Sequence, residues 1–113
     1  MIKGVYVSEI ETLRSYYLSD NVMITQHAAE RCRERRILSS DIESAVMNGE
    51  IIEYHPDDFP FPRCLILGRT NDNKIIHVCM SDEGSGARII TAYFPSMDKW
   101  QPDFKTRKAV NSK

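Results

Sequence analysis

The chain has 113 residues, 42% of them hydrophobic and 27% charged, and this length and composition predict one globular domain. Its 15 basic and 16 acidic residues give a net charge of −1. This balance excludes a nucleic-acid surface built from overall charge and leaves only local clusters. No apolar run is long enough to cross a membrane, and the first residues lack the apolar core of a secretory signal, so we expect a cytoplasmic protein.

Residues 1–23 are predicted to form a helix that covers the core from the N-terminal side. Apolar side chains recur near helical spacing over residues 5–19, at Ile10, Leu13, Tyr16 and Tyr17, before Asp20-Asn21 breaks the pattern. We interpret these tyrosines as packing residues.

The stretch from Ile24 to Ile37 predicts a second helix that begins after Thr25 as its N-cap. At about 100° per residue, His27, Arg31 and Arg35 fall at roughly 0°, 40° and 80°, in one row that we call the His–Arg row. Ala28, Ala29 and Cys32 lie beside this row as a narrow apolar stripe. The pattern therefore predicts a docked helix with an imidazole and two guanidiniums along one flank of its buried face.

Residues 41–48 are predicted to form a third helix. Ser40 and Glu43 have the spacing of a capping box, and Gly49 sits where a helix end favours a positive φ. From residue 50 the pattern changes to strands, and the intervening Pro56, Pro60 and Pro62 cannot continue a ladder. The predicted strands cover residues 50–55, 63–69, 74–81 and 87–94.

Short connections between consecutive strands predict an antiparallel meander. The predicted fold class is α+β, with N-terminal helices packed on one face of a four-stranded, mainly antiparallel sheet in the order α-α-α-β-β-β-β. We assign residues 24–100 to a single domain and residues 101–113 to a partly disordered tail. Trp100 either anchors this tail on the sheet, which we favour, or stacks on a base.

His27 is the strongest candidate for chemistry. Unpaired N–H groups at the helix N-terminus and the cation Arg31 one turn later both favour a neutral imidazole. A neutral imidazole beside guanidiniums suits metal-free RNA cleavage, in which a base takes the 2′-OH proton and arginines hold the phosphorane. The alternative is a histidine that packs at the helix start, with arginines that are solvated or paired to Glu30, Glu34 and Asp41.

Other polar residues have structural interpretations of equal or greater weight. His77 alternates with buried strand residues and is predicted to be buried and hydrogen-bonded, whereas His55 begins a proline-rich loop and should be exposed. Tyr93 either joins the His–Arg row as an acid or phosphate donor or packs in the core. Arg63, Arg69 and Arg88 stand at strand ends, where they either contact phosphates or solubilise the chain.

The cysteines Cys32, Cys64 and Cys79 are odd in number and have no Cys-x-x-Cys spacing, so we interpret them as reduced, mostly buried thiols. Zinc held by these thiols with His27 and His77 is an alternative, but the spacing matches no known ligand pattern. We therefore expect no metal and no cofactor.

Three motifs in order resemble the domain-of-unknown-function 4258 family: His27 to Arg35 (His-Ala-Ala-Glu-Arg-Cys-Arg-Glu-Arg), Asn48 to Glu53 (Asn-Gly-Glu-Ile-Ile-Glu) and Ile89 to Tyr93 (Ile-Ile-Thr-Ala-Tyr). The family is thought to be related to the RelE/ParE/BrnT-like toxins, small α+β proteins many of which cleave RNA. This resemblance implies a ribonuclease-like site at His27, Arg31 and Arg35 with Tyr93 as a fourth member, and a small antitoxin as partner.

The expected function is therefore that of a metal-free endoribonuclease toxin of a toxin–antitoxin pair, acting on RNA. The alternative is a non-catalytic module that binds a nucleic acid or a protein through the same basic flank. The sequence does not indicate an oligomeric state.

Overall fold

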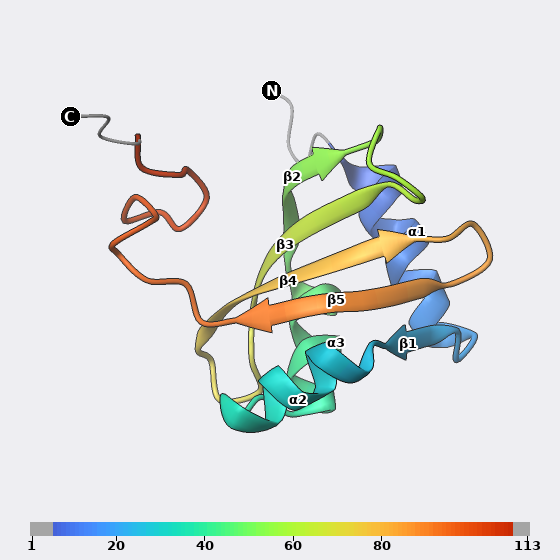
Figure 1. Ribbon diagram of the computed structural model, residues 1–113, viewed down its shortest axis with the longest axis horizontal. Helices are drawn as coiled ribbons and strands as arrows, with labels where there is room; N and C mark the ends of the chain where they lie inside the picture. The colour runs from blue at the N-terminus through green and yellow to red at the C-terminus, as the bar shows by residue number, and fades with distance from the viewer. Residues whose placement is uncertain (1–5, 110–113) are drawn as a thin grey trace.

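A five-stranded mixed sheet forms the centre of the computed structural model, which describes residues 6–109 (Figure 1). The strand order is β1-β5-β4-β3-β2. In chain order the elements are α1 (Val7–Leu18), β1 (Val22–Ile24), α2 (Gln26–Glu34), α3 (Ser39–Asn48), β2 (Glu50–His55), β3 (Arg63–Arg69), β4 (Ile75–Asp82) and β5 (Ala87–Tyr93). The α+β class is confirmed, as is the antiparallel meander of β2, β3, β4 and β5.

The prediction of four strands was wrong, because Val22–Ile24 forms a fifth strand. This strand pairs in parallel with β5, so the sheet is mixed and the element order is α-β-α-α-β-β-β-β. Asp20 adopts a left-handed conformation (φ 59°) and turns the chain back after α1, and the Asn21 carbonyl then accepts from the Ala87 N–H. A strand of three residues carries too little alternation to be read from sequence.

The third helix begins two residues earlier than predicted. Leu38 is its N-cap in place of the predicted Ser40, and the carboxylate of Asp41, in place of Glu43, accepts a hydrogen bond from the Leu38 N–H (3.1 Å). Gly49 has an extended backbone (φ −98°) and not the predicted positive φ. Glycine is needed there for another reason, because a Cβ would collide with the carbonyl oxygens of Ala45 and Leu67.

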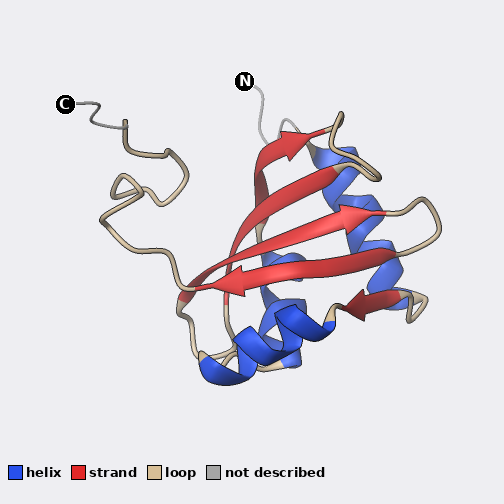
Figure 2. Ribbon diagram, viewed as in Figure 1, coloured by secondary structure: helices blue, strands red, loops and turns tan. Residues whose placement is uncertain are grey.

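The three helices bury their apolar sides in one core on one side of the sheet. Figures 1 and 2 show α1 and α3 behind the sheet and α2 below β5. The core combines Leu13 of α1, Cys32 of α2 and Val46 of α3 with strand residues such as Ile66 and Val78. Side chains in such a core pack with few voids, and the burial of their apolar area holds the helices on the sheet.

We call the sheet face away from α1 and α3 the open face. Its side chains form rows across the strands, because register fixes which residues lie opposite each other. One row runs His55–Arg63–Ser81–Arg88, the next Glu53–Leu65–Cys79–Thr91, and the third Leu67–His77–Tyr93.

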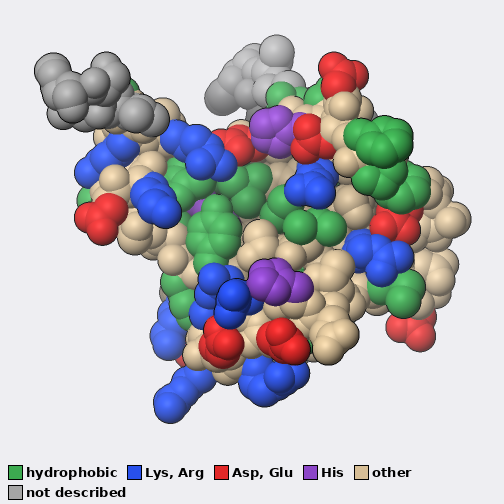
Figure 3. Space-filling model, viewed as in Figure 1, with side chains coloured by type: hydrophobic (Ala, Val, Ile, Leu, Met, Phe, Trp, Pro, Cys, Tyr) green, Lys and Arg blue, Asp and Glu red, His purple; other side chains and the backbone are tan. Residues whose placement is uncertain are grey.

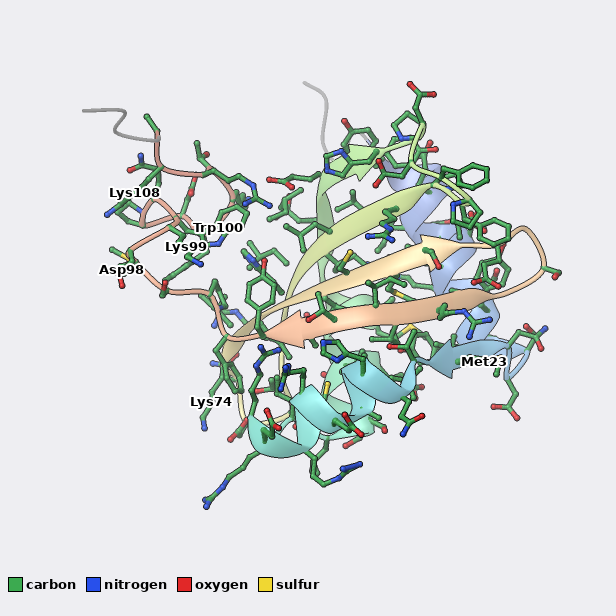
Figure 4. All side chains as sticks on the ribbon, in the orientation of Figure 1. Met23, Lys74, Asp98, Lys99, Trp100 and Lys108 are labelled. Atoms are coloured by element: carbon green, nitrogen blue, oxygen red, sulfur yellow. The ribbon has the colours of Figure 1, made fainter. Side chains whose placement is uncertain are left out.

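The C-terminal segment, residues 95–109, folds back on one end of the open face. Trp100 is only 2% exposed, and its ring meets the ring of His77 edge-on with centroids 4.5 Å apart. Arg107 of this segment forms a bidentate pair with Glu53 of β2 (2.6 and 3.1 Å). In Figure 4, Trp100 lies on this segment beside the charged residues Asp98, Lys99 and Lys108. Residues 110–113 of the predicted tail lie outside the described residues.

No helix within residues 6–109 is long and apolar enough to cross a membrane.

Candidate functional site

The α2 helix lies along β5 beyond the point where β1 ends. Thr25 is its N-cap, as predicted, and its hydroxyl accepts from the Ala28 N–H (3.0 Å). The Thr25 N–H in turn donates to Ile89 of β5 (3.3 Å), which fixes the start of the helix against the sheet. Ala28 and Cys32 are buried, so the predicted apolar stripe is the docked side of the helix.

His27 is exposed in the first turn of α2. Within residues 6–109 its imidazole makes no hydrogen bond, ion pair or ring contact. Both ring nitrogens are therefore open to a ligand, which a histidine that packs at the helix start would not offer.

Both arginines of the His–Arg row (His27, Arg31 and Arg35, called the α2 row from here on) have partners. Arg31 is half-exposed and pairs with Glu34 one turn later (3.0 Å), an interaction that solvent weakens. Arg35 forms the C-cap of the helix, and its Nη1 donates to the Ala92 carbonyl of β5 (2.8 Å). Arg35 therefore fastens the end of α2 to the sheet, whereas Arg31 can exchange its carboxylate for another anion.

The hydroxyl of Tyr93 lies with a different group of residues, on the open face. It is 3.2 Å from Nδ1 of His77, and Nε2 of His77 is 2.8 Å from the Phe104 carbonyl. A carbonyl only accepts, so these partners assign the ring proton to Nε2 and make Tyr93 the donor to Nδ1. The α2 row and the Tyr93 hydroxyl therefore face different partners, although Tyr93 directly follows the Ala92 carbonyl that holds Arg35.

His77 is fully buried and hydrogen-bonded at both nitrogens, as predicted. Burial lowers the pKa of its imidazole, which keeps the ring neutral, and burial raises the pKa of the Tyr93 hydroxyl. The pair is thus a neutral hydrogen-bonded unit that orients the Tyr93 ring.

No local sequence pattern indicated the charged group on the open face around Glu53. Arg107 holds the pKa of the Glu53 carboxyl below its usual range, and His55 lies 3.5 Å from the same carboxylate. Figure 3 views this face and shows basic side chains and histidines interspersed with acidic ones around an apolar area. Glu53 and Arg107 lie 54 positions apart, so no local pattern could have paired them.

The three cysteines are free thiols, with Cys32 and Cys64 buried. Burial raises the pKa of all three thiols, which disfavours a reactive thiolate. In the part of the chain that the structure describes, no three His, Cys, Asp or Glu side chains are grouped so that they could hold a metal ion.

Fold and surface together define a small α+β protein with a helix-borne His–Arg row beside a mixed sheet. The family model described as "Domain of unknown function (DUF4258)" matches residues 24–94, more than half of the chain. The protein belongs to this family. The matched region runs from the end of β1 through β5 and leaves out α1 and the C-terminal segment. No curated protein and no solved structure gave a significant match.

Proposed function

We propose that the protein is a metal-free endoribonuclease of the RelE/ParE/BrnT-like kind, acting on RNA in the cytoplasm as the toxin of a toxin–antitoxin pair. The observation that carries this proposal is the exposed imidazole of His27. It has no partner within residues 6–109 and stands one helical turn from Arg31, whose present partner is only a surface carboxylate. Three free thiols suit a reducing compartment.

In this mechanism His27 takes the proton of a ribose 2′-OH, and the 2′ oxygen attacks the adjacent phosphorus. The bond to the 5′ oxygen breaks, that oxygen takes a proton from water, and the product carries a 2′,3′-cyclic phosphate. Arg31 leaves Glu34 and stabilises the charge on the phosphorane. Arg35 has a positioning role, because its guanidinium donates to the Ala92 carbonyl and so holds the end of α2 on β5. Tyr93 contributes binding, since its proton is directed to His77.

The test is cleavage of labelled RNA by the purified protein in EDTA. His27→Ala should abolish cleavage, whereas Arg33→Ala, a charge change on the same helix outside the row, should leave it intact. The proposal is wrong if no RNA is cut under any condition, or if the His27 variant cuts as well as the wild type.

A second candidate is a non-catalytic module that binds nucleic acid through the same flank. The observation in its favour is that Arg31 has only a solvent-exposed carboxylate as its partner, and a phosphate can replace that carboxylate without any catalytic base. This module would show RNA binding that weakens steeply with salt, without turnover. Arg31→Ala would weaken that binding and His27→Ala would hardly change it.

A partner surface supports the antitoxin part of the proposal. Met23, Ile24 and Leu38 are large apolar side chains left exposed, and Met23 lies on the outer strand β1 (Figure 4). Two hollows that share Ile24 run beside them, and Arg33 and Arg36 line one of the two. An acidic amphipathic segment of an antitoxin would fit this combination. Leu38→Asp should then abolish suppression of toxicity by a co-expressed antitoxin from the adjacent reading frame, while toxicity itself persists.

A further inference from the structure

Two hollows lie on the open face and meet at Arg63. The first has a volume of about 270 Å³ and is lined by residues that include His55, Thr91 and Tyr93. The second has about 310 Å³ and is lined by residues that include Phe61 and Ile90. Arg63 is the one residue that lines both.

Arg63 differs from the other arginines around these hollows because its guanidinium has no acidic partner within residues 6–109. Arg88 pairs with Glu83 (2.8 Å) and Arg107 pairs with Glu53. Arg63 is half-buried at the start of β3, and within residues 6–109 its guanidinium makes no hydrogen bond and no ion pair. A guanidinium has five N–H donors in a planar fork and is costly to bury without acceptors, so this position favours an anion.

The surroundings of Arg63 select the kind of anion. Glu53 and Glu83 are already neutralised by their arginines, and the remaining carboxylate, Asp58, lines the first hollow. Asp58 therefore offsets the charge of Arg63 in the first hollow and disfavours an anion there, whereas the second hollow, lined by Arg63, Arg88 and Glu83, keeps one positive charge. The second hollow offers Phe61 and Ile90 as an apolar wall next to the cation.

We propose that the open face binds one phosphate group of a nucleotide, with the phosphate on Arg63 and the base against Phe61 and Ile90. Arginine binds phosphate oxygens in a bidentate manner, and aromatic side chains stack on bases of any sequence. The same chemistry is offered by a free nucleoside monophosphate and by one step of single-stranded RNA. This site goes beyond the proposed function, because His27, Arg31 and Arg35 line neither hollow.

The experiment is calorimetric titration of the full chain with AMP, the dinucleotide ApA, adenosine and inorganic phosphate. AMP or ApA should bind more tightly than adenosine or phosphate alone, because only they engage both Arg63 and the apolar wall. Tighter binding of AMP identifies a free nucleotide as the ligand, and tighter binding of ApA identifies a single-stranded step.

Arg63→Gln should weaken nucleotide binding about tenfold or more, and Arg63→Lys should weaken it less, because lysine keeps the charge without the planar fork. The matched control is Arg69→Gln at the other end of the same strand, which should bind like the wild type. Shifts of the Phe61 and Ile90 resonances on addition of AMP give a second measurement on the unaltered chain.

The proposal is wrong if neither AMP nor ApA binds the wild type at a nucleotide concentration of about 10 mM, which would largely occupy even a site with a Kd of about 1 mM. It is equally wrong if Arg63→Gln binds as well as Arg69→Gln. His27→Ala, which tests RNA cleavage, should retain AMP binding, so each proposal can fail without the other.

Discussion

Replacement of Trp100 by alanine tests whether the C-terminal segment is part of the folded structure. The four residues before Trp100 are exposed, yet Trp100 itself is 2% exposed, with the His77 ring on one side and the Arg107 guanidinium 4.6 Å from its ring centroid. A buried Trp side chain of about 200 Å² contributes about 5 kcal/mol at about 25 cal/mol per Å². Because the segment can detach instead of leaving a cavity, we expect a smaller loss, about 2–4 kcal/mol.

Two measurements check this prediction. Chemical denaturation gives the change in free energy of unfolding, and an NMR titration follows the His77 imidazole. Detachment of the segment should expose His77, and because burial is the largest cause of its lowered pKa, that pKa should rise toward its ordinary value even though the Phe104 carbonyl, which acts to raise it, is lost. Lys99→Ala, next to Trp100 and exposed, is the control. A loss below about 1 kcal/mol in the Trp100 variant, with the His77 pKa unchanged, would refute the idea of an anchored segment.

Three further predictions concern stability. Arg35→Ala should lower the free energy of unfolding by about 1 kcal/mol, because its hydrogen bond to the Ala92 carbonyl is lost. The control Arg33→Ala should lower it by about 0.5 kcal/mol or less. Equal losses in denaturation curves would argue against an anchoring role for Arg35. Gly68→Ala should cost more than about 2 kcal/mol by calorimetry, because its Cβ would collide with the backbone of α3, and a neutral effect would contradict that packing. The lowered pKa of His77 means that the unfolded chain binds more protons, so the free energy of unfolding should fall as the pH drops from about 6.5 through the folded-state value, and His77→Gln should flatten this dependence.

Local patterns predicted the strands well. The bounds of β2 and β3 agree with the sequence to the residue, because turn residues and prolines delimit short alternating runs. The missing element was β1, whose stability depends on pairing with β5 some sixty positions later and not on its own residues. A parallel partner so distant leaves no periodic signal in three residues.

The candidate site was predictable only in part. Helical periodicity was sufficient to propose His27, Arg31 and Arg35 as neighbours, because all three belong to one short helix. The partner of Arg35 is a backbone carbonyl, and every residue offers one, so no sequence feature marks it. Alternation placed Thr91 and Tyr93 on one face of β5 but could not say which surface that face would meet.

The end of β5 is where the two proposed surfaces approach each other. The Ala92 carbonyl points to the free edge and holds Arg35 of α2, while Tyr93, the next residue, places its ring on the open face and donates to His77. Because strand carbonyls point along the sheet and side chains stand perpendicular to it, the adjacent Ala92 carbonyl and Tyr93 ring can support both arrangements. A single-stranded nucleic acid on the α2 row would reach the open face by crossing this corner, where Tyr93 offers an aromatic ring. Such a strand would contact the Tyr93 ring whether or not His27 performs catalysis.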